Sequence, residues 1–242
     1  MKPVANLDVT IRALASAPLF SAFSATELAT LAAQSRRRHY DDRDVVFYFG
    51  DPGNGLFIVL AGTIKIAVNA PDGQETMIAL LGAGECFGEM AVLDGQPRSA
   101  TASAMEKTET LFLPRTGFLA FLEQHRDAVH KIILLLARRL RETDEHVADL
   151  VFHDVYGRLA KRLLHLAEHR GQKNASGRIE IDLPLTQQDL ANLVGASRES
   201  VNKAMKDFRA KGYVTVMQQR ITVNDRAALR ASVEASLGRL RG

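Results

Sequence analysis

The sequence predicts an α+β fold with three successive parts. Short apolar runs separated by glycine-containing turns occupy residues 45 to 113, a long helical pattern follows to about residue 152, and shorter helical patterns lead to a final β-hairpin ending at residue 223. Many short strands at regular spacing predict an antiparallel sandwich or barrel, whereas apolar residues three and four apart predict helices. The 242 residues, of which 46% are hydrophobic, suffice for about two domains with a core each.

The charge of the chain is unevenly distributed. Residues 186 to 242 carry 10 Lys and Arg against 5 Asp and Glu, or +5, so the first 185 residues carry −2 of the net +3. A basic end on a near-neutral body indicates a polyanion-binding end, the alternative being a solvated lysine-rich surface. One cysteine excludes a disulfide framework and a Cys₄ metal site. Because no export signal or apolar run of about 18 residues is present, we expect a cytoplasmic protein without a membrane partner.

The first 40 residues read as short helices. Ser24 and Glu27 form a capping-box pattern, which predicts a helix through about Gln34. Arg36-Arg37-Arg38 follows, and we interpret it as a solvated face rather than as a nucleic-acid patch.

From residue 45 the pattern changes to strands. Six runs are apolar or alternating, as strands require: Val45–Phe49, Leu56–Leu60, Thr63–Val68, Thr76–Leu81, Ala100–Ala104 and Thr110–Leu113. Turn signals separate them at residues 50–53, 61–62, 71–73 and 82–84. The barrel they predict has a small interior, suited to one small ligand.

A helical period begins near Thr116 and continues as a long helix to about Phe152-His153. Its apolar residues step by four and three, as in an a/d seam: Val129, Ile133, Leu136, Leu140, Thr143, Val147 and Leu150. So narrow a seam favours a two-helix dimer axis over one face of a buried core helix. Thr143 is the polar member, and it sets the register or contacts a ligand; we favour the ligand. Asp154 then caps a helix from Val155 to about His169, and residues 171–177 read as a polar exposed loop.

The segment Gly84-Glu85-Cys86-Phe87-Gly88-Glu89-Met90-Ala91, followed by Arg98-Ser99-Ala100, has the groups that a cyclic phosphodiester on a ribose needs. Gly88 lets an anion approach backbone N–H groups. Arg98 adds a planar charged fork to the same phosphate. Glu89 is placed to accept from a ribose 2′-hydroxyl. We interpret Cys86 as a packed thiol.

Residues 186 to 204 have the spacing of a helix-turn-helix. Thr186 caps the first helix, Ala191 is small where two helices cross, Gly195 lies in the turn, and Val201 packs the second helix back on the first. The alternative is an ordinary helical hairpin.

The outer side of the second helix favours a DNA-reading element. Ser197 is its N-cap, and Arg198, Glu199, Asn202 and Lys203 lie on the half that enters a major groove. Arginine pairs with guanine and glutamate with cytosine. A hairpin follows, Tyr213–Met217 and Arg220–Val223 with its turn at Gln218-Gln219, and it reads as a wing whose Arg220 contacts phosphate.

Together these elements resemble the Crp/Fnr family of bacterial transcription regulators, and within it the members similar to the cAMP receptor protein. The resemblance extends from about Leu19 to Val223 and includes the motifs above with Ala137-Arg138-Arg139-Leu140, Asp154-Val155-Tyr156-Gly157-Arg158 and Val194-Gly195-Ala196-Ser197-Arg198-Glu199-Ser200-Val201. It implies a cyclic-nucleotide-binding β-roll (a jelly roll) over residues 1–127, a dimerisation helix over 128–153 and a winged helix-turn-helix over 154–242.

The resemblance also implies roles for individual residues. Glu89 takes the ribose hydroxyl, Arg98 and Ser99 take the cyclic phosphate, and Thr143 takes the exocyclic amine of the base. The expected nucleotide-binding set is Gly88, Glu89, Met90, Arg98, Ser99, Thr143 and Asp144. The expected DNA-binding set is Gln188, Ser197, Arg198, Glu199, Ser200, Lys203 and Arg220. Expected partners are a second copy of the chain, double-stranded operator DNA and RNA polymerase.

Three departures bear on these roles. Asp144 stands where the best-known members have a serine that reaches the base from the partner subunit, and its carboxylate accepts from adenine or from guanine alike. Lys203 replaces an arginine, so its guanine contact is single rather than bidentate. The Glu89-to-Arg98 loop is one residue shorter. Asp144 makes the choice of base less secure, and we expect cAMP as effector, with cGMP or cyclic-di-GMP as the alternatives.

Two other function classes remain for comparison. A regulatory module that controls another protein would not need residues 186–223. An enzyme acting on cyclic nucleotides would need a metal cluster or a positioned base, and the seven histidines show no metal-ligand spacing beside the motif. His165 and His169 form an i, i+4 pair without a third ligand. We therefore expect no catalytic residue and no metal site.

Overall fold

The computed structural model describes residues 7–70, 73–174 and 176–239. Its contacts divide the chain into two compact units, Met1–Asn69 with Ile78–Leu140, and Ala70–Met77 with Arg141–Gly242. The expected turn at 71–73 and the expected loop at 171–177 therefore lie partly outside the described residues. Among those described, no helix is both long and apolar enough to cross a membrane.

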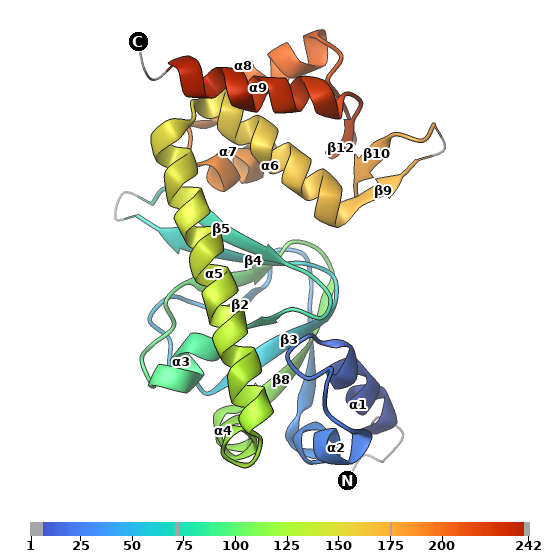
Figure 1. The fold of residues 1–242 in the computed structure, drawn as a ribbon, viewed down its shortest axis with the longest axis vertical. Helices are drawn as coiled ribbons and strands as arrows, with labels where there is room; N and C mark the ends of the chain where they lie inside the picture. The colour runs from blue at the N-terminus through green and yellow to red at the C-terminus, as the bar shows by residue number, and fades with distance from the viewer. Residues whose placement is uncertain (1–6, 71–72, 175, 240–242) are drawn as a thin grey trace. The chain divides into compact units, whose positions relative to one another are not determined.

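The first unit begins with two short helices that lie side by side, α1 (Leu7–Ser16) and α2 (Ala25–Gln34) (Figure 1). The predicted capping box is confirmed: Ser24 Oγ accepts from Glu27 N at 3.3 Å, and Ser24 N donates to the Glu27 carboxylate at 2.7 Å. Two reciprocal bonds satisfy N–H groups that a helix start leaves without partners.

Two four-stranded sheets form the predicted all-β part. The first has the order β1 (Arg36–Tyr40), β8 (Thr108–Pro114), β3 (Gly55–Ala61) and β6 (Cys86–Phe87). The second has the order β2 (Val45–Phe47), β7 (Thr101–Ala104), β4 (Ile64–Asn69) and β5 (Glu75–Leu81). Each of the six expected strands exists, with ends shifted by one or two residues. The strand pairs β1–β8, β3–β8, β3–β6, β2–β7 and β4–β7 are antiparallel.

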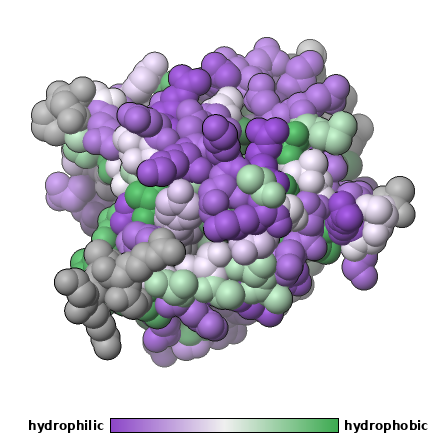
Figure 2. Space-filling view, turned by 90° about the horizontal axis from the view of Figure 1, so that it is seen from above, coloured by the Kyte–Doolittle hydropathy of each residue, from purple (hydrophilic) through white to green (hydrophobic). Residues whose placement is uncertain are grey.

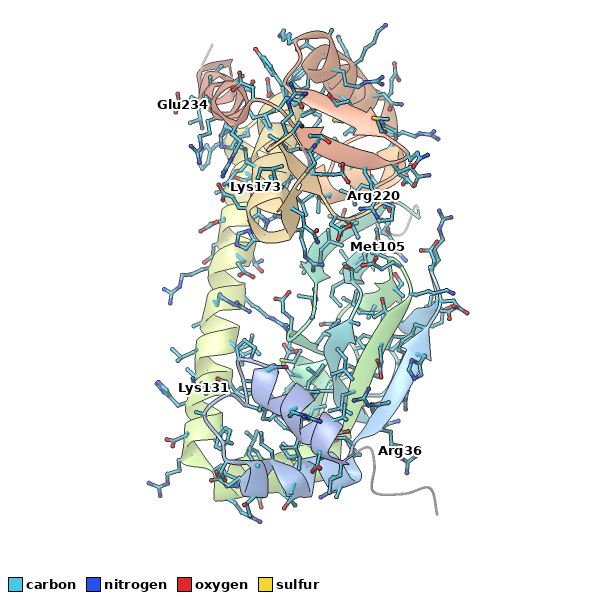
Figure 3. All side chains as sticks on the ribbon, turned by 90° about the vertical axis from the view of Figure 1, so that its right-hand side faces the viewer. Arg36, Met105, Lys131, Lys173, Arg220 and Glu234 are labelled. Carbon is cyan, nitrogen blue, oxygen red and sulfur yellow. The ribbon has the colours of Figure 1, made fainter. Side chains whose placement is uncertain are left out.

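The prediction of helices alone in the first 40 residues was wrong for the arginine run, which forms β1 at the edge of the first sheet. Arg36 and Arg38 are exposed as expected, and Arg36 points away from the sheet in Figure 3. The strand is favoured because its arginines interact with side chains of the neighbouring strand β8. Arg37 Nη1 bonds Glu109 Oε1 at 2.6 Å, and the Arg38 guanidinium stacks 4.3 Å above the Phe112 ring.

The space between the two sheets is filled by aromatic and branched side chains. Phe57 and Phe87 stack with ring centroids 5.0 Å apart, and Phe47 and Phe112 pack beside them. Phe87 is the last residue of β6 and directly precedes Gly88. Burial of Phe87 therefore fixes the position of the segment that carries the phosphate-binding pattern. This segment continues into the short helix α3 (Glu89–Asp94).

The helical pattern after residue 115 forms two helices rather than one, because His125 has an extended backbone that interrupts the helix. These are α4 (Arg115–Gln124) and the 27-residue α5 (Arg126–Phe152), whose end agrees with the predicted end. Ala128 and Ile132 on α5 are buried, and Leu136 packs on the core of the first unit. The other apolar seam residues are exposed, with Leu140 at 63%. Helix α5 thus presents an uncovered apolar stripe.

In the described part of the second unit, four helices and one small sheet follow α5. Asp154 caps α6 (Val155–Arg170), and the sheet has the order β11 (Val214–Met217), β12 (Arg220–Val223), β10 (Ile179–Ile181) and β9 (Gly171–Lys173). The predicted hairpin is confirmed, since Gln218 and Gln219 have φ of 48° and 66° and form a two-residue turn. The expected loop at 171–177 was partly wrong, because its first three residues pair with β10. The last helix is α9 (Arg226–Arg239), which packs on α6 (Figure 1).

Candidate functional site

The residues of the phosphate-binding pattern meet at one pocket of about 80 Å³ in the first unit. Its lining includes Gly88, Glu89, Met90, Arg98 and Ser99 from the expected set. It also includes residues outside the expected binding set: Phe47, Ile66, Phe87, Ala91, Ala100 and Arg139. Five of the seven expected nucleotide-binding residues are therefore brought together in space.

Gly88 is required at its position for two reasons. Its φ is +75°, in the left-handed region, and a Cβ there would lie 2.4 Å from Arg98 Nη1. Gly88 also precedes α3, whose first N–H groups have no side-chain cap. The turn therefore leaves backbone donors beside the pocket and lets Arg98 come close.

Arg98 is the most enclosed cation of the pocket. It is 4% exposed, its Nη1 and Nη2 donate to Gly88 O at 2.7 Å and to Gly55 O at 2.6 Å, and its guanidinium lies 4.2 Å from the Phe47 ring centroid. Within the described residues its Nε has no partner. Burial lowers the pKa of Arg98, and the nearby carboxylates of Asp51 and Glu89 offset this only in part.

Glu89 is 1% exposed and is held by one residue of α5. Arg139 Nη1 bonds Glu89 Oε1, and Arg139 Nη2 donates to Cys86 O. Burial opposes the charge of Arg139, but Glu89 and its other neighbours outweigh burial and raise the pKa of Arg139. The second carboxylate oxygen, Glu89 Oε2, is buried without a partner in the described part of the chain.

Arg139 belongs to the motif Ala137-Arg138-Arg139-Leu140 but is not in the expected binding set, and the structure places it at the pocket. It lies one helical turn before Thr143, so both occupy the same face of α5. This spacing could have identified Arg139 from the sequence, because a residue four positions before Thr143 on a helix lies on the same face and would be near the same ligand. Cys86 is buried as expected, and burial raises the pKa of its thiol to about 12.

The remaining expected nucleotide-binding residues are exposed. Ser99 Oγ lies 3.9 Å from Met90 Sδ, and both side chains are at the surface. Thr143 and Asp144 are exposed on the part of α5 that belongs to the second unit. Their roles toward the base stay predictions.

In the second unit, α7 (Gln187–Val194) and α8 (Arg198–Ala210) form the predicted helix-turn-helix. Thr186 and Asp189 make a reciprocal capping box, and Gly195 closes α7 with φ 60° and ψ 50°. Ala191 and Val201 are buried where the helices pack. Ala191, Gly195 and Val201 therefore occupy the places in the helix-turn-helix that their spacing predicts.

The expected DNA contacts lie at the surface of this motif. Arg198, Glu199 and Lys203 are exposed on α8, whose start is capped by Ser197 Oγ accepting from Ser200 N at 3.2 Å. Gln188 is exposed on α7 and donates to Asn192 Oδ1 at 2.8 Å. The face shown in Figure 2, which includes the second unit, is mostly hydrophilic.

Arg220 lies on β12 of the wing and is labelled in Figure 3. Its Nη1 pairs with Asp182 Oδ1, and Glu180 Oε1 is 3.9 Å away. All three side chains are more than a third exposed, so water screens these pairs. The wing therefore carries a cation that two carboxylates partly neutralise.

The two halves of the chain match two family models. Residues 37–125 match the cyclic nucleotide-binding domain, and residues 157–232 match the Crp-like helix-turn-helix domain. The first range contains the pocket motif from Gly88 to Ser99, and the second contains α7, α8 and the wing.

Whole-chain relatives agree with these matches. The CRP-like cAMP-activated global transcriptional regulator of Mycobacterium tuberculosis is 35% identical over 88% of this chain and 94% of its own length. The cyclic AMP receptor protein of Thermus thermophilus has the same identity and coverage. The c-di-GMP responsive regulator CLP of Xanthomonas campestris has the same fold, with a TM-score of 0.74 over 84% of this chain and 100% of its own at 24% identity. These relatives are regulators rather than enzymes, and the chain belongs to the Crp/Fnr family as a cyclic-nucleotide-binding, DNA-binding transcription regulator.

Proposed function

We propose that this regulator is a homodimer that cAMP switches to a palindromic operator. The observation that carries the proposal is the buried Glu89 Oε2, which lacks a hydrogen-bond donor among the described residues and belongs to the pocket that Arg98 lines. A buried carboxylate oxygen without a donor costs free energy. A ribose 2′-hydroxyl supplies that donor, whereas a 2′-deoxyribose does not.

The phosphate would bind at Arg98. A guanidinium has five N–H donors, and Arg98 uses two of them on the carbonyls of Gly88 and Gly55. Ser99 and the uncapped N–H groups after Gly88 are further donors at the same pocket. In this proposal the negative phosphate compensates the positive charge of Arg98, which burial makes unfavourable.

The base would be read by Thr143 and Asp144 on α5. We favour adenine because two relatives at 35% identity carry cAMP in their names. The Asp144 carboxylate accepts from guanine equally well, so cGMP is the effector to compare. Cyclic-di-GMP is the other comparison, and for it Glu89 and Arg98 would have to serve a larger ligand.

The apolar stripe of α5 supports the dimer. Leu140 and Val147 are exposed in the single chain, although leucine and valine each contribute about 1.5–3 kcal/mol when buried. Pairing with the same helix of a second copy would cover them. In this proposal residues 1–127 bind nucleotide, 128–153 dimerise and 154–242 read DNA and act with RNA polymerase in the cytoplasm. Two recognition helices would then lie about 34 Å apart, one turn of DNA.

Calorimetric titration with cAMP, cGMP and cyclic-di-GMP tests the effector. We expect cAMP to bind most tightly, and tighter binding of either other ligand would contradict that part of the proposal.

The Arg98→Leu variant tests the phosphate site in the same titration. We expect cAMP binding to weaken by about 2–3 kcal/mol, because a charge-assisted partner of a buried phosphate is lost. Arg115→Leu is the matched control, since Arg115 lies outside the pocket and its Nε donates to Val92 O at 3.0 Å. Unchanged affinity in Arg98→Leu would show that the phosphate binds elsewhere.

A further inference from the structure

A buried polar cluster lies where α5 meets α6, and neither the nucleotide pocket nor the DNA-reading helix uses it. Ser236 of α9, His153 and Asp149 are 1%, 9% and 7% exposed. His153 Nδ1 is 2.5 Å from Ser236 Oγ, and His153 Nε2 is 3.9 Å from Asp149 Oδ1. Lys161 Nζ holds the same Asp149 oxygen at 2.5 Å.

The hydrogen bonds of Ser236 have a defined direction. Its hydroxyl donates to Val233 O at 2.6 Å within α9, so its oxygen is left to accept. With Ser236 as acceptor, we assign the proton of this contact to His153 Nδ1, which donates to Ser236 Oγ. A serine, a histidine and an aspartate together resemble a hydrolytic triad, but this hydroxyl is fully enclosed and already donates to a backbone carbonyl. The cluster is a tether between helices.

The tether depends on a glycine in α6. A Cβ on Gly157 would lie 2.0 Å from Ser236 Oγ and 3.2 Å from His153 Nδ1. Gly157 thus makes room for Ser236 to reach the junction. Leu229 of α9 is fully buried, and Arg226 Nη2 pairs with Glu168 Oε1 of α6 at 2.5 Å. Helix α9 is therefore docked on α6 along its length, with Ser236 at the junction end.

The same junction is bonded to the turn of the helix-turn-helix. His153 O accepts from Arg158 Nη1 at 3.0 Å, and Arg158 Nη2 donates to Gly195 O at 3.4 Å. A Cβ on Gly195 would lie 3.0 Å from Leu150 Cδ2, so the end of α5 also packs on this turn. A chain of contacts thus runs from Ser236 through His153 and Arg158 to the start of the recognition helix.

We infer that Ser236, acting through His153, is a positioning residue that holds the α5–α6 junction in the arrangement that presents the helix-turn-helix to DNA. The inference rests on the proposed function, since the junction ends the helix that carries Thr143 and Asp144. Ser236 lies beyond residue 232, where the match to the Crp-like helix-turn-helix domain ends. Only His153 and Asp154 separate α5 from α6, and Asp154 bonds inside α6 to Gly157 N at 2.9 Å. His153 is thus the residue through which α9 constrains the junction between α5 and α6.

The test measures the ratio of DNA affinities with and without saturating cAMP, on a two-fold-symmetric duplex selected from a random library in the presence of cAMP. We expect Ser236→Ala to reduce this ratio about tenfold, the effect of one lost buried hydrogen bond. Ser232→Ala is the matched control, because Ser232 is also on α9 but its hydroxyl donates within that helix, to Ala228 O at 2.9 Å. We expect the control to leave the ratio unchanged.

Two substitutions of His153 separate positioning from folding. Asparagine places an amide donor near the position of Nδ1, so His153→Asn should keep most of the ratio, whereas His153→Gln moves the donor and should lose it. Thermal unfolding of each variant is recorded beside the DNA titrations. An unchanged ratio in Ser236→Ala and His153→Gln, even with a lowered Tm, would overturn the inference. Absence of any cAMP effect in the unaltered chain would overturn the proposed function together with the inference.

Discussion

Single residues decide which ligand the pocket accepts. Glu89 has one carboxylate oxygen committed to Arg139 and one buried without a donor among the described residues. Arg139 therefore orients the carboxylate, and the second oxygen is left for a hydroxyl. We therefore propose that Glu89 is the residue that distinguishes ribose from deoxyribose.

The Glu89→Ala variant tests this distinction. The unaltered chain should prefer cAMP over 2′-deoxy-cAMP by about 1.5–3 kcal/mol, the range for a hydrogen bond to a charged group. The variant should bind the two ligands equally, because the acceptor is gone. Competition calorimetry measures both affinities, and a preference that survives in Glu89→Ala would place the ribose hydroxyl elsewhere.

The wing provides a test of phosphate contact. Arg220→Ala should weaken binding to every DNA sequence alike and reduce the slope of log K against log salt by about 0.9, since one phosphate contact is lost. Asp182→Asn should instead strengthen binding to DNA, because Asp182 competes with phosphate for Arg220. Fluorescence anisotropy over a series of salt concentrations measures both.

A charge-matched control belongs to the wing experiment. Glu168→Gln removes one negative charge from the same unit at a site away from the wing, where Glu168 pairs with Arg226 and Arg230. If Glu168→Gln strengthened DNA binding as much as Asp182→Asn, the effect would be one of net charge, and Arg220 would have no specific phosphate contact.

At the scale of elements, we propose that the dimer forms through α5. Leu140→Lys should convert the dimer to monomer in sedimentation, because two like charges would face each other in an apolar seam that each leucine stabilises by about 1.5–3 kcal/mol. Leu134→Lys is the control, since Leu134 is 52% exposed on the same helix but lies outside the seam. A Leu140→Lys variant that stays dimeric would show that copies associate through another surface.

Some elements of the fold could be predicted from neighbouring residues in the sequence, and others could not. The capping boxes at Ser24 and Thr186, the end of α5 and the hairpin at Gln218-Gln219 followed from the sequence because each depends on residues within one turn. The strand β1 did not, because its arginines are strand residues only through Glu109 and Phe112, more than 70 positions away. The short polar strand β9 is likewise specified by its pairing with β10.

The candidate site shows the same limit. The Gly88 to Ser99 pattern predicted five pocket residues, since the turn and helix that hold them are local. Arg139 and the aromatic wall at Phe47 come from other elements and meet Glu89 and Arg98 only after folding. The junction cluster of Ser236 and His153 joins residues 83 positions apart, and no short pattern marks it.

At the scale of the whole molecule, our proposal links cAMP binding in one unit to DNA binding in the other. If cAMP favours the arrangement that binds DNA, operator DNA must favour the arrangement that binds cAMP by the same factor. Couplings of this kind are typically about 5–150-fold. Nucleotide binding without an effect on DNA would instead fit a regulatory module that acts on another protein.

The most direct measurement is therefore a reciprocal titration of the unaltered chain. The affinity for the selected two-fold-symmetric duplex is measured with and without saturating cAMP, and the affinity for cAMP with and without saturating duplex, at one salt concentration. We predict that both affinities rise by the same factor of at least about five. A DNA affinity that is identical with and without cAMP, or a duplex that leaves cAMP affinity unchanged, would contradict the proposal that cAMP controls DNA binding in this chain.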